Sequence, residues 1–376
     1  MTFINILDAW PVERLQRLFA GITAESVTAA LAREQRDLFD LAALLSPVAR
    51  PFMESMAQQA HALTRRYFGR TISLYAPLYL SNVCGARCVY CGFSSDNKTH
   101  ETRTTLSRHE IERECEVLSH LGYESVLLLT GDAPSAAPPA YIAEACAIAR
   151  NYFSTVAVEV YAMDTDEYGL LCRHGMDSIT LYMETYDRAA YGAMHLAGRK
   201  KDFLYRLGAI ERAADAGARR ISIGALLGLF QWHYEALYLG LHARYLQTRC
   251  WQSALAISFP RLRNTPAHFK TPHPVSDADL VQMMLALRLF LPEAGFNLST
   301  RERPELRDHL LPLGITSMSA GSSTRPGGYA QPSCKNLAQF QIEDQRPPEQ
   351  VAAMIKNAGY DPVWKDFDQA FLESGV

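Results

Sequence analysis

Three cysteines lie within eight positions in the first quarter of the chain, with the spacing C-x3-C-x2-C: Cys84, Cys88 and Cys91. Thiolates prefer soft metals, which in proteins means zinc or an iron–sulfur cluster. A structural zinc site normally closes with four protein ligands, and the only nearby candidate for a fourth is His100. A 4Fe–4S cluster held by three thiolates instead keeps one iron open to bind a small chelating molecule. The spacing therefore indicates a catalytic iron–sulfur site, with zinc as the alternative.

Other charged residues lie in apolar runs or follow predicted strands. Glu159 lies in the run VAVEV, and a buried carboxylate is costly unless it is paired, so we treat it as a site candidate. Arg301 follows a strand, and its planar guanidinium matches a carboxylate; a structural ion pair with Glu302 or Glu305 is the alternative. His195 and Lys200 lie in the loop AMHLAGRKKDF, where the alternatives are a bystander histidine and a solvated lysine.

The elements that must position these side chains begin with helices over residues 5 to about 70, where apolar residues recur at helical spacing. Eight strand-like runs then alternate with helices, and runs such as SVLLLT are apolar throughout, as in a parallel sheet buried on both faces. Eight such units predict an α/β protein with a closed (β/α)8 TIM-like barrel; a doubly wound open sheet is the alternative. The predicted strands are Thr71–Leu80, Ser125–Thr130, Thr155–Tyr161, Ser178–Met183, Ile221–Gly224, Ala254–Ser258, Phe296–Ser299 and Ile315–Ser319.

We expect three segments: an N-terminal helical extension (residues 1–70), the barrel (71–335) and a C-terminal cap (336–376). The cap contains one predicted helix, Pro348–Asn357, and then an aromatic stretch, Tyr360 to Phe371. Within the barrel, Ser-x-x-Glu from Ser107 is a capping box that predicts a helix start. A longer helix is predicted over Asp202–Ala216, closed by a glycine.

The composition excludes several classes of protein. Apolar residues make up 48% of the 376 residues and charged residues 20%, which is ordinary for a globular protein and unlike a disordered chain. The net charge is 37 − 40 = −3, so no broad basic field suggests nucleic acid or an anionic membrane as a partner. No apolar run reaches about 18 residues, and the first 16 residues lack the features of a signal peptide. We expect a cytoplasmic enzyme.

The cysteine spacing, with an aromatic residue before its last cysteine, resembles the signature of the radical S-adenosylmethionine (SAM) enzymes. Several further blocks resemble one branch of them, the aromatic amino acid lyases, and most of all the tyrosine lyases of thiamine thiazole biosynthesis. These blocks cover nearly the whole chain: LYLSNVC…CVYCGFS (78–94), YMETY (182–186), FPRLR (259–263), LSTRE (298–302), SAGSS…PGGY (319–329) and PVWKDFD (362–368). The resemblance implies a radical SAM barrel that splits SAM and cleaves the Cα–Cβ bond of L-tyrosine, giving 2-iminoacetate and p-cresol.

The resemblance also implies roles for single residues. Cys84, Cys88 and Cys91 would hold the 4Fe–4S cluster. The residues expected near SAM are Tyr90 against the adenine, Phe93, Gly131 and Asp132 at the turn that contacts the SAM amino group, Glu159, Lys200 and Gly224. The residues expected at the substrate are Arg301 on its carboxylate, Ser319 beside it, and Tyr182 and Glu184 after the fourth strand. Relatives carry Glu where this chain has Asp132, and a shorter carboxylate leaves room for a backbone carbonyl to make that contact instead.

The resemblance further implies a flavodoxin or ferredoxin as the electron donor and a complex with thiazole synthase, which would consume the unstable imine. Two alternatives stay open: the same chemistry on tryptophan, and a non-catalytic iron–sulfur or zinc module. Arg261 and Arg263 fit SAM, substrate or structure equally well. The other cysteines are interpreted as ordinary thiols, and Cys334 stands alone, whereas the related tyrosine lyase of hydrogenase maturation has a second cysteine cluster near its C-terminus.

Overall fold

The computed structural model describes residues 2–263 and 269–365. Eight parallel strands form a closed barrel, in which β1 pairs with both β2 and β8. This confirms the predicted barrel and excludes the open sheet. The strands are β1 (Thr71–Ser81), β2 (Ser125–Thr130), β3 (Thr155–Glu159), β4 (Ser178–Thr180), β5 (Arg220–Gly224), β6 (Ala254–Ser258), β7 (Gly295–Leu298) and β8 (Ser317–Ser319).

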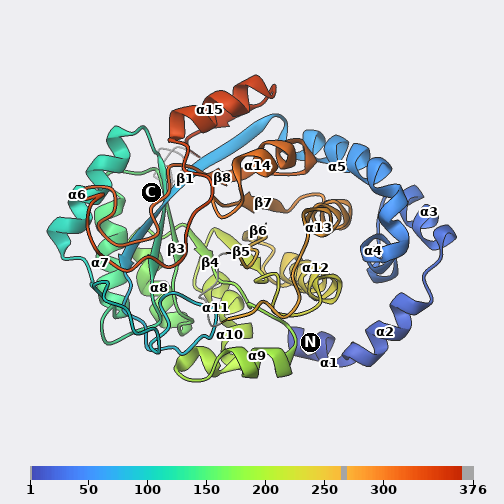
Figure 1. Cartoon of the computed structure of the whole chain (residues 1–376), viewed down its shortest axis with the longest axis horizontal. Coiled ribbons are helices and arrows are strands. Elements are labelled where there is room, and N and C mark those ends of the chain that lie inside the picture. Colours follow the sequence, from blue (N-terminus) through green and yellow to red (C-terminus); the bar gives the residue numbers. More distant parts are fainter. Residues whose placement is uncertain (1, 264–268, 366–376) are drawn as a thin grey trace.

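Helices surround the barrel and bury the outward side chains of the strands (Figure 1). Ser107 accepts a hydrogen bond from the backbone N–H of Glu110, as its capping box predicts. The predicted helix Asp202–Ala216 is broken at Gly208, where helix propensity is low. The helices and short 3-10 turns are α6 (Arg108–His120), α7 (Pro139–Ala149), α8 (Thr165–Arg173), α9 (Arg188–Met194), η2 (Arg199–Lys201), α10 (Phe203–Leu207), α11 (Ala209–Asp215), α12 (Trp232–Arg249), α13 (Asp277–Phe290), α14 (Pro304–Leu310) and η3 (Leu311–Leu313).

The N-terminal helices form an arc around α12 and α13 (Figure 1). Buried polar contacts fix the arc to the barrel: the Gln282 side chain on α13 donates hydrogen bonds to the carbonyls of Leu44 and Ser46. The arc consists of α1 (Phe3–Ala9), α2 (Val12–Ala20), α3 (Ala24–Ala32), α4 (Leu38–Leu45), η1 (Pro47–Phe52) and α5 (Met53–Phe68). The extension therefore shares the hydrophobic core of the barrel.

A long connection after β8, residues 320–346, crosses the end of the barrel where the strands finish; we call it the mouth segment. Its Asp344 forms a fully buried ion pair with Arg307 of α14. Five residues earlier, Gln339 accepts a hydrogen bond of 2.6 Å from the Tyr79 hydroxyl on β1. At the start of the mouth segment, Ala320 N donates to the Tyr75 carbonyl of β1 over 3.3 Å. Both ends of the mouth segment are thus tied to barrel elements, which places its side chains over the strand ends.

The tail continues through α15 (Pro348–Asn357) into β9 (Asp361–Val363), which pairs with the first residues of β1. The sequence does not reveal β9, because it has three residues and contains Pro362, which is tolerated only at a sheet edge. The predicted aromatic stretch Tyr360 to Phe371 lies partly outside the described residues, as does PVWKDFD. The division at residues 70 and 335 stays our proposal.

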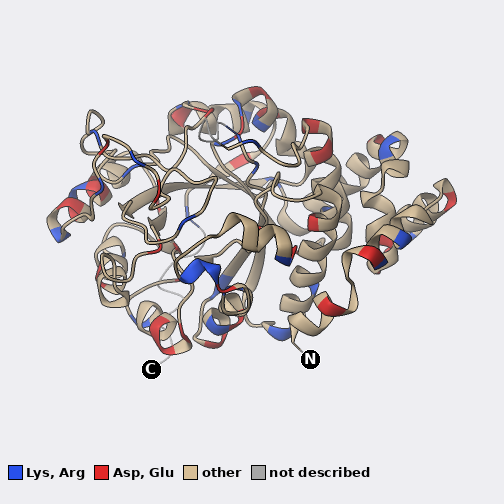
Figure 2. Ribbon diagram, turned by 60° about the horizontal axis from the view of Figure 1, so that its bottom comes forward, with Lys and Arg blue, Asp and Glu red and all other residues tan. Residues whose placement is uncertain are grey.

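Positions of Lys and Arg alternate with positions of Asp and Glu along the helices and loops (Figure 2). This agrees with the net charge of −3. None of the helices that the structure describes combines the length and apolarity needed to cross a bilayer.

Candidate active site

The cysteine loop follows the end of β1 and is held by backbone hydrogen bonds to the loop after α9. Arg87 N donates to Ala197 O over 3.1 Å, and Leu196 N donates to Arg87 O over 2.9 Å. Cys88 forms an isolated antiparallel bridge with His195 between these bonds. The metal-binding loop therefore has a fixed backbone, although it contains no regular secondary structure.

The three thiols lie close enough to influence one another's charge. Cys88 is buried, whereas Cys84 and Cys91 are partly exposed. Burial raises the pKa of Cys88 to about 12 and also raises that of Cys91, while the ammonium of Lys200 lowers both pKa values. A metal centre binds such groups as thiolates, so its binding releases their protons.

The donor set itself suits a 4Fe–4S cluster, because it consists of three thiols on one short loop that act on one another's charge. Among the described residues, no three His, Cys, Asp or Glu side chains are arranged to hold a single metal ion. In a 4Fe–4S cluster each thiolate binds a different iron, so the ligands stand farther apart. Cys84, Cys88 and Cys91 therefore fit the cluster that the sequence predicts, and Cys91 lines a large cavity from which a small molecule would reach it.

The turn after β2 packs directly against the cysteine loop. A Cβ added at Gly131 would lie 2.2 Å from the Val83 carbonyl oxygen, so only glycine fits there. The next residue, Asp132, donates its N–H to the Cys84 sulfur over 3.4 Å and accepts a hydrogen bond of 2.8 Å from Gly85 N. Its carboxylate Oδ1 is buried without a hydrogen-bond partner among the described residues. The turn predicted to contact SAM thus adjoins the first cysteine. It also carries a carboxylate oxygen that is free to accept a hydrogen bond from a ligand.

A buried ion triad forms another wall of the cavity. Glu184 contacts the ammonium of Lys200 at 2.6 Å and the guanidinium of Arg206 at 3.3 Å. Burial alone would raise the pKa of Glu184, but the two cations outweigh it and hold that pKa below its usual value. Glu184 also has a φ of 70°, the only positive value for a non-glycine residue in the described chain, and such strain is concentrated at functional sites.

Glu159 and Tyr182 lie at neighbouring strand ends and point into the barrel. Burial and the charge of Glu184 raise the pKa of Glu159 to about 7, while Arg301 and Lys200 act against the rise. The neighbouring Tyr182 also acts to lower the pKa of Glu159. Tyr182 also explains Gly224 on β5, because a Cβ there would lie 2.8 Å from the Tyr182 ring. Both predicted site residues therefore line the cavity.

Arg301 is left free of ion pairs among the described residues. Its guanidinium lies 3.6 Å from the ring centroid of Phe340 in the mouth segment. The structure excludes the alternative ion pair, because Glu302 binds Arg261 and Arg263 and Glu305 lies near Arg303. An arginine oriented on an aromatic ring and without an ion-pair partner is suited to an anionic ligand.

The same contacts decide between the alternatives for Arg261 and Arg263, which form structural ion pairs with the buried Glu302. Ser319 lies beside Arg301, as the sequence predicts, and its hydroxyl accepts a hydrogen bond of 3.1 Å from Thr300 N. That hydroxyl is therefore already engaged in holding the loop that carries Arg301.

The rings of Tyr90 and Phe93 are each held in place by a neighbouring side chain. The Nδ1 of His195 is 2.8 Å from the Tyr191 carbonyl, which only accepts, so Nδ1 carries the proton. The Nε2 atom then accepts the hydrogen bond from the Tyr90 hydroxyl, also 2.8 Å. Phe93 packs edge-on against Tyr79 with centroids 5.9 Å apart. His195 is thus a partner of Tyr90, which decides against the bystander alternative that the sequence leaves open.

These residues line one cavity of about 1210 Å³ at the carboxyl ends of the strands, where barrel enzymes place their active sites. It brings together most of the predicted site residues: Tyr90, Cys91, Glu159, Tyr182, Glu184, Lys200, Arg301 and Ser319. Three further residues shape this site without a sequence signal: Arg206, Gln339 and Phe340. Arg206 is hidden in an ordinary helix, and the other two belong to an irregular segment.

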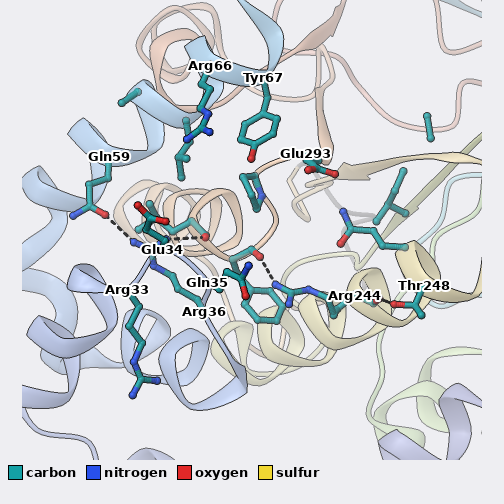
Figure 3. Close-up of a pocket in the computed structure, with 18 of the residues that line it drawn as sticks. Arg33, Glu34, Gln35, Arg36, Gln59, Arg66, Tyr67, Arg244, Thr248 and Glu293 are labelled. Atoms are coloured by element: carbon teal, nitrogen blue, oxygen red, sulfur yellow. Dashed lines mark hydrogen bonds between the residues drawn. The ribbon is translucent and has the colours of Figure 1, made fainter. Parts of the chain in front are cut away.

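A second cavity of about 1190 Å³ lies at the opposite end of the barrel, between α3, α5, α12 and α13 (Figure 3). Its labelled side chains include Arg36, Gln59, Arg66 and Arg244, and none of the residues predicted for the site lies there.

The comparisons with known proteins agree with this geometry. Residues 78–237 match the model of the radical SAM superfamily, and residues 258–361 match the biotin and thiamin synthesis associated domain. A closed parallel barrel with three such cysteines after its first strand defines a radical SAM protein, a class that uses a 4Fe–4S cluster and SAM.

Similar proteins place the chain within this class. The 2-iminoacetate synthases of Salmonella typhimurium (strain LT2) and Escherichia coli (strain K12) are each 41% identical over 93% of this chain and 92% of theirs. The crystal structure of HydG, a maturase of the [FeFe]-hydrogenase, superposes with a TM-score of 0.87 at 30% identity, over 94% of this chain and 80% of that one. Methylornithine synthase shares the fold, with a TM-score of 0.73 at 20% identity. The chain belongs to the 2-iminoacetate synthase family of radical SAM enzymes.

Proposed function

We propose that this enzyme cleaves the Cα–Cβ bond of L-tyrosine to 2-iminoacetate and p-cresol for thiamine thiazole biosynthesis, splitting SAM to 5′-deoxyadenosine and methionine. One observation supports this above all: a single cavity has the cysteine loop on one wall and an unpaired arginine on another. The relatives that are 41% identical carry the matching name.

The chain's own residues bind and orient the two ligands. Cys84, Cys88 and Cys91 would hold the 4Fe–4S cluster, which with bound SAM and one electron supplies a 5′-deoxyadenosyl radical. We assign to SAM the residues that share the cysteine wall or adjoin it: Tyr90, Phe93, Gly131, Asp132, Lys200 and Gly224. Glu159, which the resemblance places near SAM, lines the same cavity and is considered separately below. The cation of Lys200 would attract the SAM carboxylate, and the free oxygen of Asp132 would accept from its amino group.

We assign the substrate to the facing wall. Arg301 would bind the tyrosine carboxylate through its planar fork, and Ser319 would support the loop that carries it. Tyr182 and Glu184 would close the space between the two ligands. The mouth segment covers the cavity and limits the access of water, which protects a reactive intermediate.

Partners and location follow from the same chemistry. A flavodoxin or ferredoxin would supply the electron, and a thiazole synthase would take the unstable imine directly. We also propose a cytoplasmic location, because all eight cysteines are free, as in a reducing compartment.

The deciding experiment is anaerobic turnover of the reconstituted enzyme with SAM, dithionite and either tyrosine or tryptophan. We expect p-cresol and 5′-deoxyadenosine from tyrosine. A non-catalytic iron–sulfur or zinc module would release no 5′-deoxyadenosine, and turnover of tryptophan alone would assign the other substrate.

A further inference from the structure

Glu159 occupies a distinctive position between the two walls of the active-site cavity. It is the last residue of β3, beside Leu129 of β2, and it points inward with the other cavity-lining residues. Lys200 and Glu184 act on its charge from the cysteine side, and Arg301 acts on it from the substrate side. A ligand that spans the two walls would therefore pass this carboxylate.

Glu159 is also the acid of the inner cavity that no cation neutralises directly. Four acidic residues line the cavity, and two of them, Glu101 and Glu349, are exposed at its rim. Glu184 is buried and bound to Lys200 and Arg206. Glu159 forms no ion pair among the described residues, and the neighbouring Tyr182 acts to lower its pKa.

A cationic group on the ligand would complete this arrangement. An α-amino acid carries its carboxylate and its ammonium on the same carbon atom. If Arg301 holds the carboxylate, the ammonium lies within the neighbouring space, where Glu159 offers the unpaired negative charge. Burying that carboxylate without a partner is costly, and an ammonium removes the cost.

A contact between Glu159 and the substrate ammonium would also serve the reaction. This inference rests on the proposed cleavage of tyrosine. An ammonium has no lone pair on nitrogen. The product is an imine, so the nitrogen must lose a proton as well as the hydrogen atom taken by the radical. A base beside the substrate amine is therefore required.

We propose that Glu159 binds the substrate ammonium and removes one proton from it before the radical step. The N–H bond breaks heterolytically, an O–H bond forms on the Glu159 carboxylate, and the amine keeps the electron pair; no oxidant or reductant takes part. The neutral amine then faces the cysteine wall, where SAM binds. Tyr182, which lines the cavity beside this carboxylate, would hold it in place.

The surroundings suit a base that works near neutral pH. Burial first, and then Glu184, raise the pKa of Glu159 to about 7, so the carboxylate is ionised above that pH and able to accept a proton. The other titratable and charged groups that act on this site from the packed elements are Tyr75, Tyr79, Tyr182, Glu184, Lys200 and Arg301.

The test compares Glu159→Gln with Glu159→Asp and the wild type in the reconstituted holoenzyme, with SAM, dithionite and tyrosine between pH 6 and about 9.5. Wild-type kcat/KM for tyrosine, which reports the free enzyme, should rise through about pH 7 and then level off. Loss of a general base should lower kcat at pH 7 by about 100-fold or more in Glu159→Gln. That variant should regain activity steadily at higher pH, where solvent deprotonates the bound amine. Glu159→Asp should keep the wild-type shape at a lower kcat.

A binding measurement gives a readout that does not depend on turnover. Equilibrium dialysis with SAM and without reductant should show tyrosine binding about tenfold weaker in Glu159→Gln, the loss of one charge-assisted hydrogen bond. The matched control ligand is 3-(4-hydroxyphenyl)propionate, which lacks the amine and should bind both proteins equally. Iron content and melting temperature report whether the variants fold.

Two results would overturn the inference: a wild-type pH profile in Glu159→Gln, or equal weakening of both ligands. A wild-type enzyme that makes no p-cresol would instead refute the proposed function. The selective effect of the amine on binding would still be measured separately.

Discussion

The two large cavities of this barrel have nearly equal volumes, about 1210 and 1190 Å³, but differ in how their charges are satisfied. In the cavity at the amino ends of the strands, Arg36 donates to the carbonyls of Ala30 and Leu289 and to the side chain of Gln59 (Figure 3). Arg244 donates to the Phe290 carbonyl in the same way. These arginines join the helical extension to the barrel. Their N–H groups are hydrogen-bonded to the protein itself and are not available to a ligand.

The active-site cavity instead contains charged side chains that no ion pair within the described residues neutralises. Among the described residues, Arg301 and Glu159 form no ion pair, and one carboxylate oxygen of Asp132 has no hydrogen-bond partner. The volume of a cavity therefore does not distinguish a ligand-binding site from a gap between packed structural elements. Buried charge left without a partner does, because a folded chain tolerates that cost only where a ligand removes it.

The largest effect is expected from Cys88→Ser in the cysteine loop. One ligand fewer should abolish cluster binding and all p-cresol formation, because three thiolates are the minimum set here. The matched control is Cys334→Ser, which changes a thiol outside the loop and should keep iron content and turnover. Iron analysis and product chromatography measure both. If the Cys88 variant retained the cluster and its activity, the assignment of the ligands would be wrong.

Next in size is Arg301→Ala, compared with Arg66→Ala in the opposite cavity. Removing a buried charged contact to a ligand costs about 2–4 kcal/mol, so kcat/KM for tyrosine should fall roughly 30- to 1000-fold. The change at Arg66 should leave kcat/KM within twofold, because that side chain is exposed and its cavity takes no part in the reaction. Steady-state kinetics at fixed SAM concentration test the difference, and equal losses in both variants would contradict the comparison.

Much of the active cavity can be predicted from the sequence. The spacing of Cys84, Cys88 and Cys91 identifies the cluster loop because few other chemistries need thiols so close together. The barrel strands are visible because parallel strands buried on both faces are continuous apolar runs. Glu159 is conspicuous for the opposite reason, as a charge within such a run.

Other features depend on tertiary structure. Arg301 has no ion-pair partner because Glu302 is already paired with Arg261 and Arg263. From the local sequence alone, an ion pair of Glu302 with any of these arginines is equally plausible. Arg206 reaches Glu184 from a helix 22 residues away, with no local pattern to mark it. Phe340 contacts Arg301 from an irregular segment. The sequence of such a segment has no hydrophobic periodicity from which its path could be predicted.

A smaller effect, on stability, is expected from Glu184→Gln, which leaves Lys200 and Arg206 without their anion. Breaking a buried ion pair on one side costs roughly 3–5 kcal/mol in the free energy of unfolding. Because the pKa of Glu184 is depressed, its contribution is present above the unfolded value of about 4.3 and is lost as pH falls through the folded value. Anaerobic urea unfolding between pH 3 and 7 should therefore show a weaker acid dependence in the variant. Parallel curves for the two proteins would refute the linkage.

The smallest effect is expected from Tyr90→Phe, which removes only the hydroxyl that donates to His195. One neutral hydrogen bond contributes about 1 kcal/mol, so KM for SAM should rise about fivefold while KM for tyrosine and iron content stay unchanged. Tyr67→Phe, in the opposite cavity, is the control and should change neither constant. A rise in KM for tyrosine instead of SAM would mean that Tyr90 faces the substrate. The cysteine wall and the arginine wall would then have to be assigned to the opposite ligands.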